Sequence, residues 1–92
     1  MKDYSKLEEV EEIMEEITKA TKATQRVRIM RHLKEGKTLT SIQALSEYGI
    51  ARLAARISEL RKRGEPILKT TREGVNKYGE TYRYAEYYLK AE

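Results

Sequence analysis

The residues best suited to chemistry stand between positions 50 and 63, where long cationic side chains alternate with small ones. Arg52 and Ala55 would suit a helix in the major groove of duplex DNA, because arginine pairs with guanine O6 and N7 and alanine allows close approach. Alternatively, Arg52 and Arg56 are ordinary solvated helix residues. For Arg56, a phosphate contact and an ion pair with Glu59 both remain open. The residues of this stretch predicted to contact DNA are Ala51, Arg52, Ala55, Arg56, Glu59, Lys62 and Arg63.

Two further groups of residues would contact the DNA backbone. Ser41 and Gln43 begin a helix, and a helix N-terminus attracts phosphate. Lys69, Arg72 and Lys77 lie on an expected hairpin, which would run along the backbone or place a cation in the minor groove. The tyrosines of the hairpin could stack on single-stranded bases, but we favour a role in stabilising the strand pair; they are Tyr82, Tyr84 and Tyr88.

No residue pattern supports catalysis. His32 is the only histidine, and nothing in the sequence pairs it with a nucleophile. The chain has no cysteine, no phosphate-binding glycine loop and no cluster at metal-ligand spacing. The glutamates between positions 8 and 16 are best interpreted as a solvated helix face. We therefore expect no enzyme activity, no metal and no cofactor.

Charge divides the chain into two parts. Residues 1–24 carry seven acids against four lysines, whereas residues 25–92 carry fifteen lysines and arginines against eight glutamates. A basic body favours nucleic acid as a partner. No apolar run approaches the roughly 20 residues that a membrane span needs. We therefore expect a cytoplasmic protein that does not enter a membrane, in which residues 24–92 form one domain after an acidic helix and connector over residues 1–23.

Apolar spacing predicts four helices. The first, at about 4–21, carries the seam Leu7, Val10, Met14 and Ile17, which would pack on the body or on a second copy. After a connector at about 20–24, a second helix at 25–34 presents Val27, Ile29, Met30 and Leu33. A third helix, 41–47, is capped by Thr40, with Ile42 and Leu45 directed inward and a small Ala44. The fourth helix, 51–63, buries Ile50, Leu53, Ile57 and Leu60.

The remainder of the chain is β-prone. Residues 37–39 could form a short extended piece, and segments 67–73 and 80–89 are expected to pair as a hairpin around a turn at 76–79. Alternation places Ala85, Tyr87 and Leu89 on the core side. Short helices joined by a glycine-containing turn, followed by a hairpin, have the order of a winged helix-turn-helix.

Three segments resemble small phage- and prophage-associated winged helix-turn-helix proteins. They are residues 24–33, residues 39–45, and residues 49–64 followed by Pro66-Ile67; the ending at 87–89 resembles the closing wing strand. The resemblance implies a mainly α fold with a β-hairpin, and a presumed role in DNA binding. Glu65 stands where an aromatic or apolar residue is more usual, and the acidic helix lies outside the family pattern.

The leading hypothesis is a sequence-specific binder of double-stranded DNA, acting as a transcriptional regulator or as an excision-type factor of a phage or mobile element. Specificity normally needs two such modules, and the candidate surface for a homodimer is the seam Leu7, Val10, Met14 and Ile17, for which internal packing is the alternative. The alternative is a protein-binding winged helix, such as a phage-encoded inhibitor of a host nucleoprotein complex, whose glutamates imitate phosphates. Single-stranded RNA on the tyrosine face is a third hypothesis.

Overall fold

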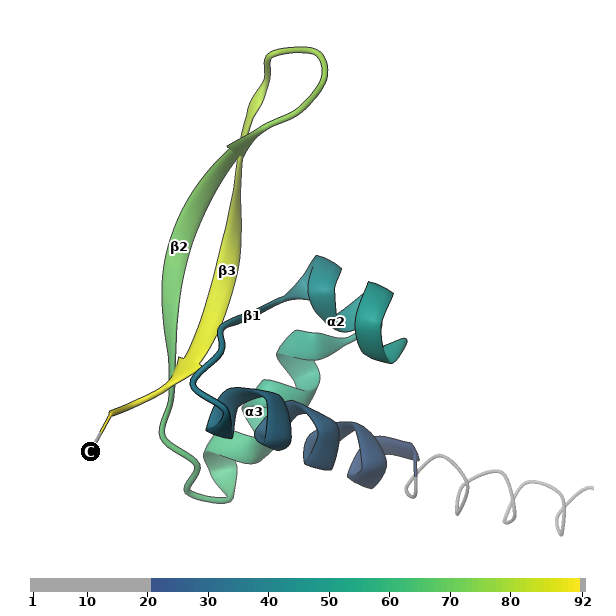
Figure 1. The fold of residues 1–92 in the computed structure, drawn as a ribbon, viewed down its shortest axis with the longest axis vertical. Coiled ribbons are helices and arrows are strands. Elements are labelled where there is room, and N and C mark those ends of the chain that lie inside the picture. Colours follow the sequence, from purple (N-terminus) through teal and green to yellow (C-terminus); the bar gives the residue numbers. More distant parts are fainter. Residues whose placement is uncertain (1–20, 92) are drawn as a thin grey trace, which may run out of the picture.

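The computed structural model describes residues 21–91, and the expected acidic helix with its seam lies outside them. A three-stranded antiparallel sheet joins a group of helices, and the long hairpin rises well beyond them (Figure 1). The fold expected from the sequence, a winged helix-turn-helix, is confirmed over these residues. In chain order the elements are a helical segment over 21–34, β1 (Leu39–Thr40), α2 (Ser41–Tyr48), α3 (Leu53–Lys62), β2 (Ile67–Val75) and β3 (Thr81–Leu89).

The helical segment 21–34 begins earlier than the sequence suggested. Residues 21–24, expected to form a connector, are already helical. They contain no glycine or proline, so nothing in their covalent structure interrupts the backbone bonding of the following helix. Ile29, Met30 and Leu33 are buried as expected, but Val27 is 57% exposed. One flank of this apolar face is therefore left uncovered among the described residues.

A capping box starts α2. The Thr40 side chain accepts from the Gln43 N–H at 3.2 Å, and the Gln43 side chain accepts from the Thr40 N–H at 3.0 Å. The expectation that Ile42 and Leu45 point inward is wrong, because they are 70% and 57% exposed. The buried edge of α2 instead carries Ala44, one turn before Tyr48.

A hydrogen bond across the core explains this rotation of α2. The hydroxyl of Tyr48 lies 2.7 Å from Nδ1 of the buried His32, and Nε2 of that ring lies 2.8 Å from the Thr38 carbonyl. Because a carbonyl can only accept, Nε2 donates to Thr38, and Nδ1 shares a hydrogen bond with the Tyr48 hydroxyl. Both ring nitrogens therefore have a hydrogen-bond partner, and the bond to Tyr48 holds that edge of α2 inward.

Helix α3 buries the face that the sequence indicated. Leu53, Ile57 and Leu60 are at most 4% exposed, and Ile50 is fully buried just before the helix. The helix runs from Leu53 to Lys62, slightly inside the expected bounds. Gly64 follows with a positive φ of 94°, a conformation that glycine adopts without steric cost, and the chain then turns into β2.

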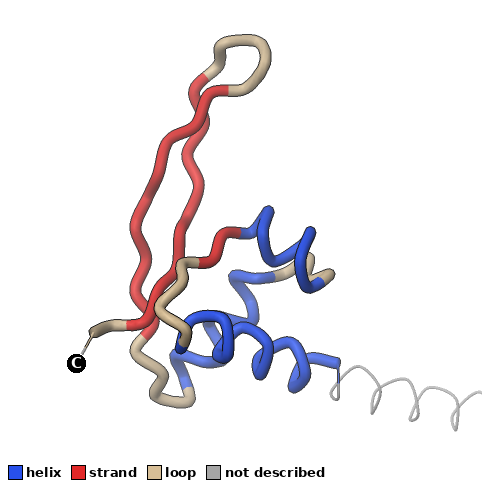
Figure 2. Tube along the Cα trace, in the orientation of Figure 1, coloured by secondary structure: helices blue, strands red, loops and turns tan. Residues whose placement is uncertain are grey.

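The sheet has the order β1-β3-β2. Strands β2 and β3 pair without interruption from Ile67 opposite Leu89 to Val75 opposite Thr81, whereas β1 contributes only Leu39 and Thr40. Asn76 stabilises the loop between β2 and β3, since its side-chain oxygen accepts from the N–H groups of Tyr78 and Glu80 at 2.9 and 3.0 Å. The base of the hairpin thus belongs to the core, and its far end is a two-stranded ribbon (Figure 2).

Candidate nucleic-acid interface

The exposed face of α3 is made of small side chains with cations at its two ends. Successive turns of the helix expose Ala54, Ser58 and Lys62, and the half-buried Ala55 lies beside them. Arg52 occupies the N-cap position, is exposed, and leaves the helix N-terminus without a side-chain hydrogen bond. Small residues allow a helix to approach base edges closely, and an uncapped N-terminus presents free N–H groups to an anion. Ala51, exposed just before Arg52, extends the same small surface.

Arg56 and Glu59 belong to an internal ion cluster instead. Glu59 accepts from Arg26 of the helical segment 21–34 at 2.7 Å and from Arg56 at 2.9 Å. The Arg56 side chain is only 7% exposed. Of the two alternatives left open for Arg56, the structure contains the ion pair with Glu59. The geometry does not support the prediction that Arg56 and Glu59 contact DNA. The Arg56 side chain is covered, and the Glu59 carboxylate already has two cationic partners.

The cluster joins two helices through two largely buried arginines and a half-exposed carboxylate. Arg26 and Glu59 are 33 residues apart in sequence, so their bond connects the helical segment 21–34 to α3. The Nε atoms of Arg26 and Arg56 are buried and have no acceptor within the described part of the chain. A buried charge is tolerated only when paired, so loss of the shared carboxylate would leave two arginines uncompensated.

We predict that this cluster makes stability depend on pH. The hydrogen bond from Arg26 lowers the pKa of Glu59 below its ordinary value of 4.5, with a further contribution from the charge of Arg56. A lowered pKa stabilises the fold above 4.5, and this stabilisation is lost as the pH falls through the folded-state pKa. Glu59→Gln should therefore be less stable than the parent at pH 7, and the difference should shrink towards pH 3. Urea unfolding midpoints across this pH range test it.

The matched control for that experiment is Glu47→Gln, which removes an exposed carboxylate from α2. It should change the unfolding midpoint little at any pH, because an exposed charge contributes little to stability. An equal destabilisation by Glu59→Gln at pH 7 and pH 3 would contradict the proposed electrostatic origin of the effect.

The cations at the end of α3 point to different surroundings. Arg61 donates from Nε to the Ile67 carbonyl at 3.0 Å, and its guanidinium lies 5.8 Å from the centre of the Tyr87 ring. It therefore fastens the helix to the base of the hairpin. Arg63 borders a groove beside the helical segment 21–34 and is separated from Lys62, which lies on the exposed face.

The hairpin distributes its cations over two faces. Lys69 is opposite Tyr87 and Arg72 opposite Tyr84, which places the two cations on opposite faces of β2. Arg72 also contacts Glu86 at 3.3 Å. Lys77 belongs to the turn, where its Nζ lies 5.0 Å from the centre of the Tyr78 ring. The sequence-predicted cations of the hairpin are thus not brought together into one patch.

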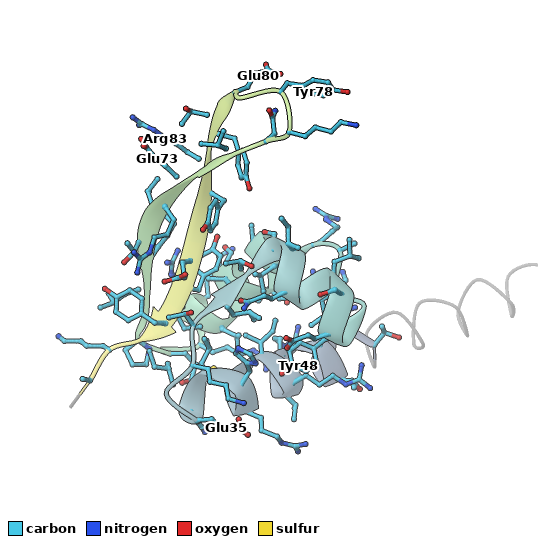
Figure 3. All side chains as sticks on the ribbon, turned by 45° about the horizontal axis from the view of Figure 1, so that its top comes forward. Glu35, Tyr48, Glu73, Tyr78, Glu80 and Arg83 are labelled. Carbon is cyan, nitrogen blue, oxygen red and sulfur yellow. The ribbon has the colours of Figure 1, made fainter. Side chains whose placement is uncertain are left out.

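Figure 3 shows how far this turn stands from the helices, with Tyr78 and Glu80 at the tip and Tyr48 in the helical body. Below the tip, Arg83 reaches across to Glu73 at 3.4 Å on the exposed part of the ribbon. A ligand that touched both α3 and this tip would have to be long and continuous.

A comparison with protein-family models matches residues 24–92 to the winged helix-turn-helix domain. The chain belongs to this family. Searches of curated proteins and of solved structures gave no match. In the terms of the family, α2 and α3 with the turn between them form the helix-turn-helix, and the β2–β3 hairpin forms the wing. Of the predicted residues, Ala55 and Lys62 belong to the exposed side of α3 and Ala51 and Arg52 are exposed just before the helix, whereas Arg56, Glu59 and Arg63 lie towards the helical segment 21–34.

Ala54, exposed in the first turn of α3, was missed by the sequence analysis. Helical spacing was the signal that could have revealed it, because Ala54 lies one turn before Ser58 and two turns before Lys62. The sequence-based prediction placed the centre of the exposed face of α3 too close to Glu59 and therefore did not include Ala54. At the start of α2, Ser41 is exposed, but the side-chain oxygen of Gln43 is engaged in the capping box.

The tyrosines of the wing pack on the wing itself. The face opposite the core carries Tyr82, Tyr84 and Tyr88, as expected from alternation. The rings of Tyr82 and Tyr84 are 5.9 Å apart, and the Tyr82 ring lies over Gly74, where even a methyl group would meet it at 2.6 Å. This packing favours a structural role for the pair, because an aromatic ring over a strand glycine stabilises a sheet.

The described residues offer no candidate for two other features, a metal site and a membrane-spanning helix. Within 21–91 there is no group of three or more histidine, aspartate or glutamate side chains that could hold a metal ion. No helix in that same range is long and apolar enough to cross a bilayer.

Proposed function

We propose that the domain binds double-stranded DNA, with α3 in the major groove and the wing along the neighbouring backbone. The observation that carries the proposal is the exposed face of α3, where Ala54, Ala55 and Ser58 form a narrow surface between two cations, Arg52 and Lys62. Neutral, small side chains allow the helix to enter the groove, and the terminal cations can pair with a guanine edge or with phosphates.

The wing would supply contacts outside the groove. Lys69 and Lys77 are exposed, and in the described part of the chain neither has a carboxylate partner among the ion pairs. Their separation along the ribbon suits the regular spacing of a phosphate backbone better than a compact ligand. Such contacts hold the register of the protein on the duplex but carry no sequence information.

The finer role that we propose is a sequence-specific regulator of transcription or an excision-type architectural factor of a phage or mobile element. Both need duplex binding, and both gain specificity from a second copy, for which Leu7, Val10, Met14 and Ile17 are the candidate seam. Bending of a bound duplex, measured by fluorescence transfer between its ends, would favour the architectural role over the regulatory one.

The test is fluorescence anisotropy of a labelled random-sequence duplex at several salt concentrations. Binding should weaken with salt at a log–log slope of about 0.9 per phosphate contact. The variant Arg52→Ala with Lys62→Ala should bind more weakly, with a slope smaller by roughly one for each phosphate contact removed. The matched control is Arg28→Ala with Lys37→Ala, which removes the same charge from exposed positions on and just after the helical segment 21–34, outside α3 and the wing.

The outcomes separate the competing functions. No duplex binding at low salt, or equal losses in the two double variants, would overturn the proposal. A preference for a single-stranded RNA probe would move the function to the tyrosine face of the wing. Retention of full duplex affinity by the Arg52 and Lys62 variant would exclude α3 as the reading element.

A further inference from the structure

An apolar groove with a cationic rim runs along the helical segment 21–34. It has a volume of about 620 Å³ and extends from Ala23 to the end of α3. Val27 and Met30 form its apolar surface together with Leu60, and Val27 is 57% exposed. This apolar face, with an exposed valine beside two core residues, is not covered by the described residues.

The rim selects for an acidic occupant. Its exposed cations are Arg31, Lys34 and Arg63, against the two acids Glu35 and Glu65. The chain itself contains a segment of the opposite character at residues 4–17, in which four apolar residues recur at helical spacing and six glutamates stand between positions 8 and 16. An amphipathic helix with acidic flanks would pair its apolar seam with the groove and its carboxylates with the rim.

The spacing of the two apolar series matches in an antiparallel sense. Along the segment, Leu7, Val10 and Met14 are separated by three and then four residues. Along the groove, read in the opposite direction, Met30, Val27 and Ala23 are separated by three and then four. Antiparallel helices with equal spacing can keep these residues opposite one another over about two turns.

A segment from a second molecule suits the groove better than the chain's own residues 4–17. Residues 21–24 are already helical where the groove begins, and residues 1–35 contain no glycine or proline. Folding back onto its own groove would require a helix reversal next to Thr21, and such reversals usually use those residues. We propose that the groove of each copy receives residues 4–17 of a second copy, which forms a reciprocal, two-fold symmetric dimer.

Such a dimer would bring together the two copies that the proposed DNA-binding function calls for, with the groove as the receiving surface. We expect Val10 of one copy to lie against Val27 of the other. Because the sequence has no cysteine, a pair introduced at these positions can be read without background. A disulfide forms only when the two Cβ atoms approach within about 4.5 Å.

The experiment mixes two single variants of the full chain, Val10→Cys and a size-tagged Val27→Cys, under mild oxidation without DNA. Disulfide-linked heterodimer is expected as the main product, and the double variant Val10→Cys/Val27→Cys should run at twice the monomer mass. The control replaces Val27→Cys by Val75→Cys, which lies on the wing and is 66% exposed. Cross-linking with Val75→Cys as efficient as with Val27→Cys would overturn the proposal.

Two other results would also overturn it. A double variant that oxidises within one chain, and migrates as a monomer, would show that the segment occupies its own groove. A wild-type chain that sediments as a monomer at tens of micromolar would show that no dimer forms. A Val27→Glu variant with an unchanged circular dichroism spectrum should sediment as a monomer, whereas the wild type should sediment as a dimer. Because none of these readouts involves DNA, failure here and failure of DNA binding are distinguishable.

Discussion

Ser58→Glu is expected to abolish specific duplex binding while leaving the fold intact. Ser58 is exposed at the centre of the α3 face, with Ala54 one turn before it and Lys62 one turn after it. A carboxylate there would be desolvated against base edges and close to phosphates, and such a juxtaposition of like charges costs several kcal/mol. Affinity should therefore fall by roughly a hundredfold or more. Anisotropy titration at fixed salt measures it.

The matched control is Ala91→Glu, which makes the same change in net charge at an exposed position after β3. It should lower affinity only slightly, through the longer-range field of the molecule. Similar losses from Ser58→Glu and Ala91→Glu would mean that net charge, and not the α3 surface, governs the interaction. Thermal unfolding of both variants checks that the fold is unchanged.

Leu39→Ala should destabilise the domain by about 2–5 kcal/mol, whereas Leu45→Ala should change its stability by only about 0.5 kcal/mol. Leu39 is fully buried in β1, opposite Tyr87 of β3, and Leu45 is 57% exposed on α2. The loss at Leu39 is a large fraction of the whole stability of a small domain, which is about 5–15 kcal/mol. Urea unfolding followed by circular dichroism gives both values.

This pair of substitutions also tests the corrected orientation of α2. Both remove the same atoms from the same residue type, so the difference between them mainly reports how deeply each side chain is buried, beside a smaller contribution from helix and strand propensity. A loss at Leu45 as large as the loss at Leu39 would show that Leu45 is buried in solution, as the sequence pattern first suggested.

The parts of the fold that the sequence predicted depend on strong local periodicity. The buried face of α3 follows from the spacing of Leu53, Ile57 and Leu60, and the two faces of the wing follow from alternation along β3. The turn at Asn76 and the cap at Thr40 are local hydrogen-bonding motifs, and the structure contains both. Such features depend on neighbours in sequence, so they could be predicted without tertiary information.

The misplaced features depend on contacts between distant residues. The rotation of α2 follows from the bond between Tyr48 and His32, sixteen residues apart, which apolar spacing alone does not reveal. Arg56 is covered because Arg26 and Glu59 meet across 33 residues. The spacing along α3 allowed the pair with Glu59, but it did not reveal the contact of Glu59 with the distant Arg26, and an arginine is ordinarily assigned to the solvent side of a helix.

The order of the sheet has a consequence for solubility. Because β1 pairs only with Tyr87 and Glu86, the far end of the wing has unpaired backbone groups along both of its edges. An open strand edge can pair with a strand of another molecule, and charged side chains commonly prevent such pairing. On this ribbon the charges belong to Lys69, Arg72, Glu73 and Arg83. Cations that face a phosphate backbone in a complex would thus act as gatekeepers against aggregation in the free protein.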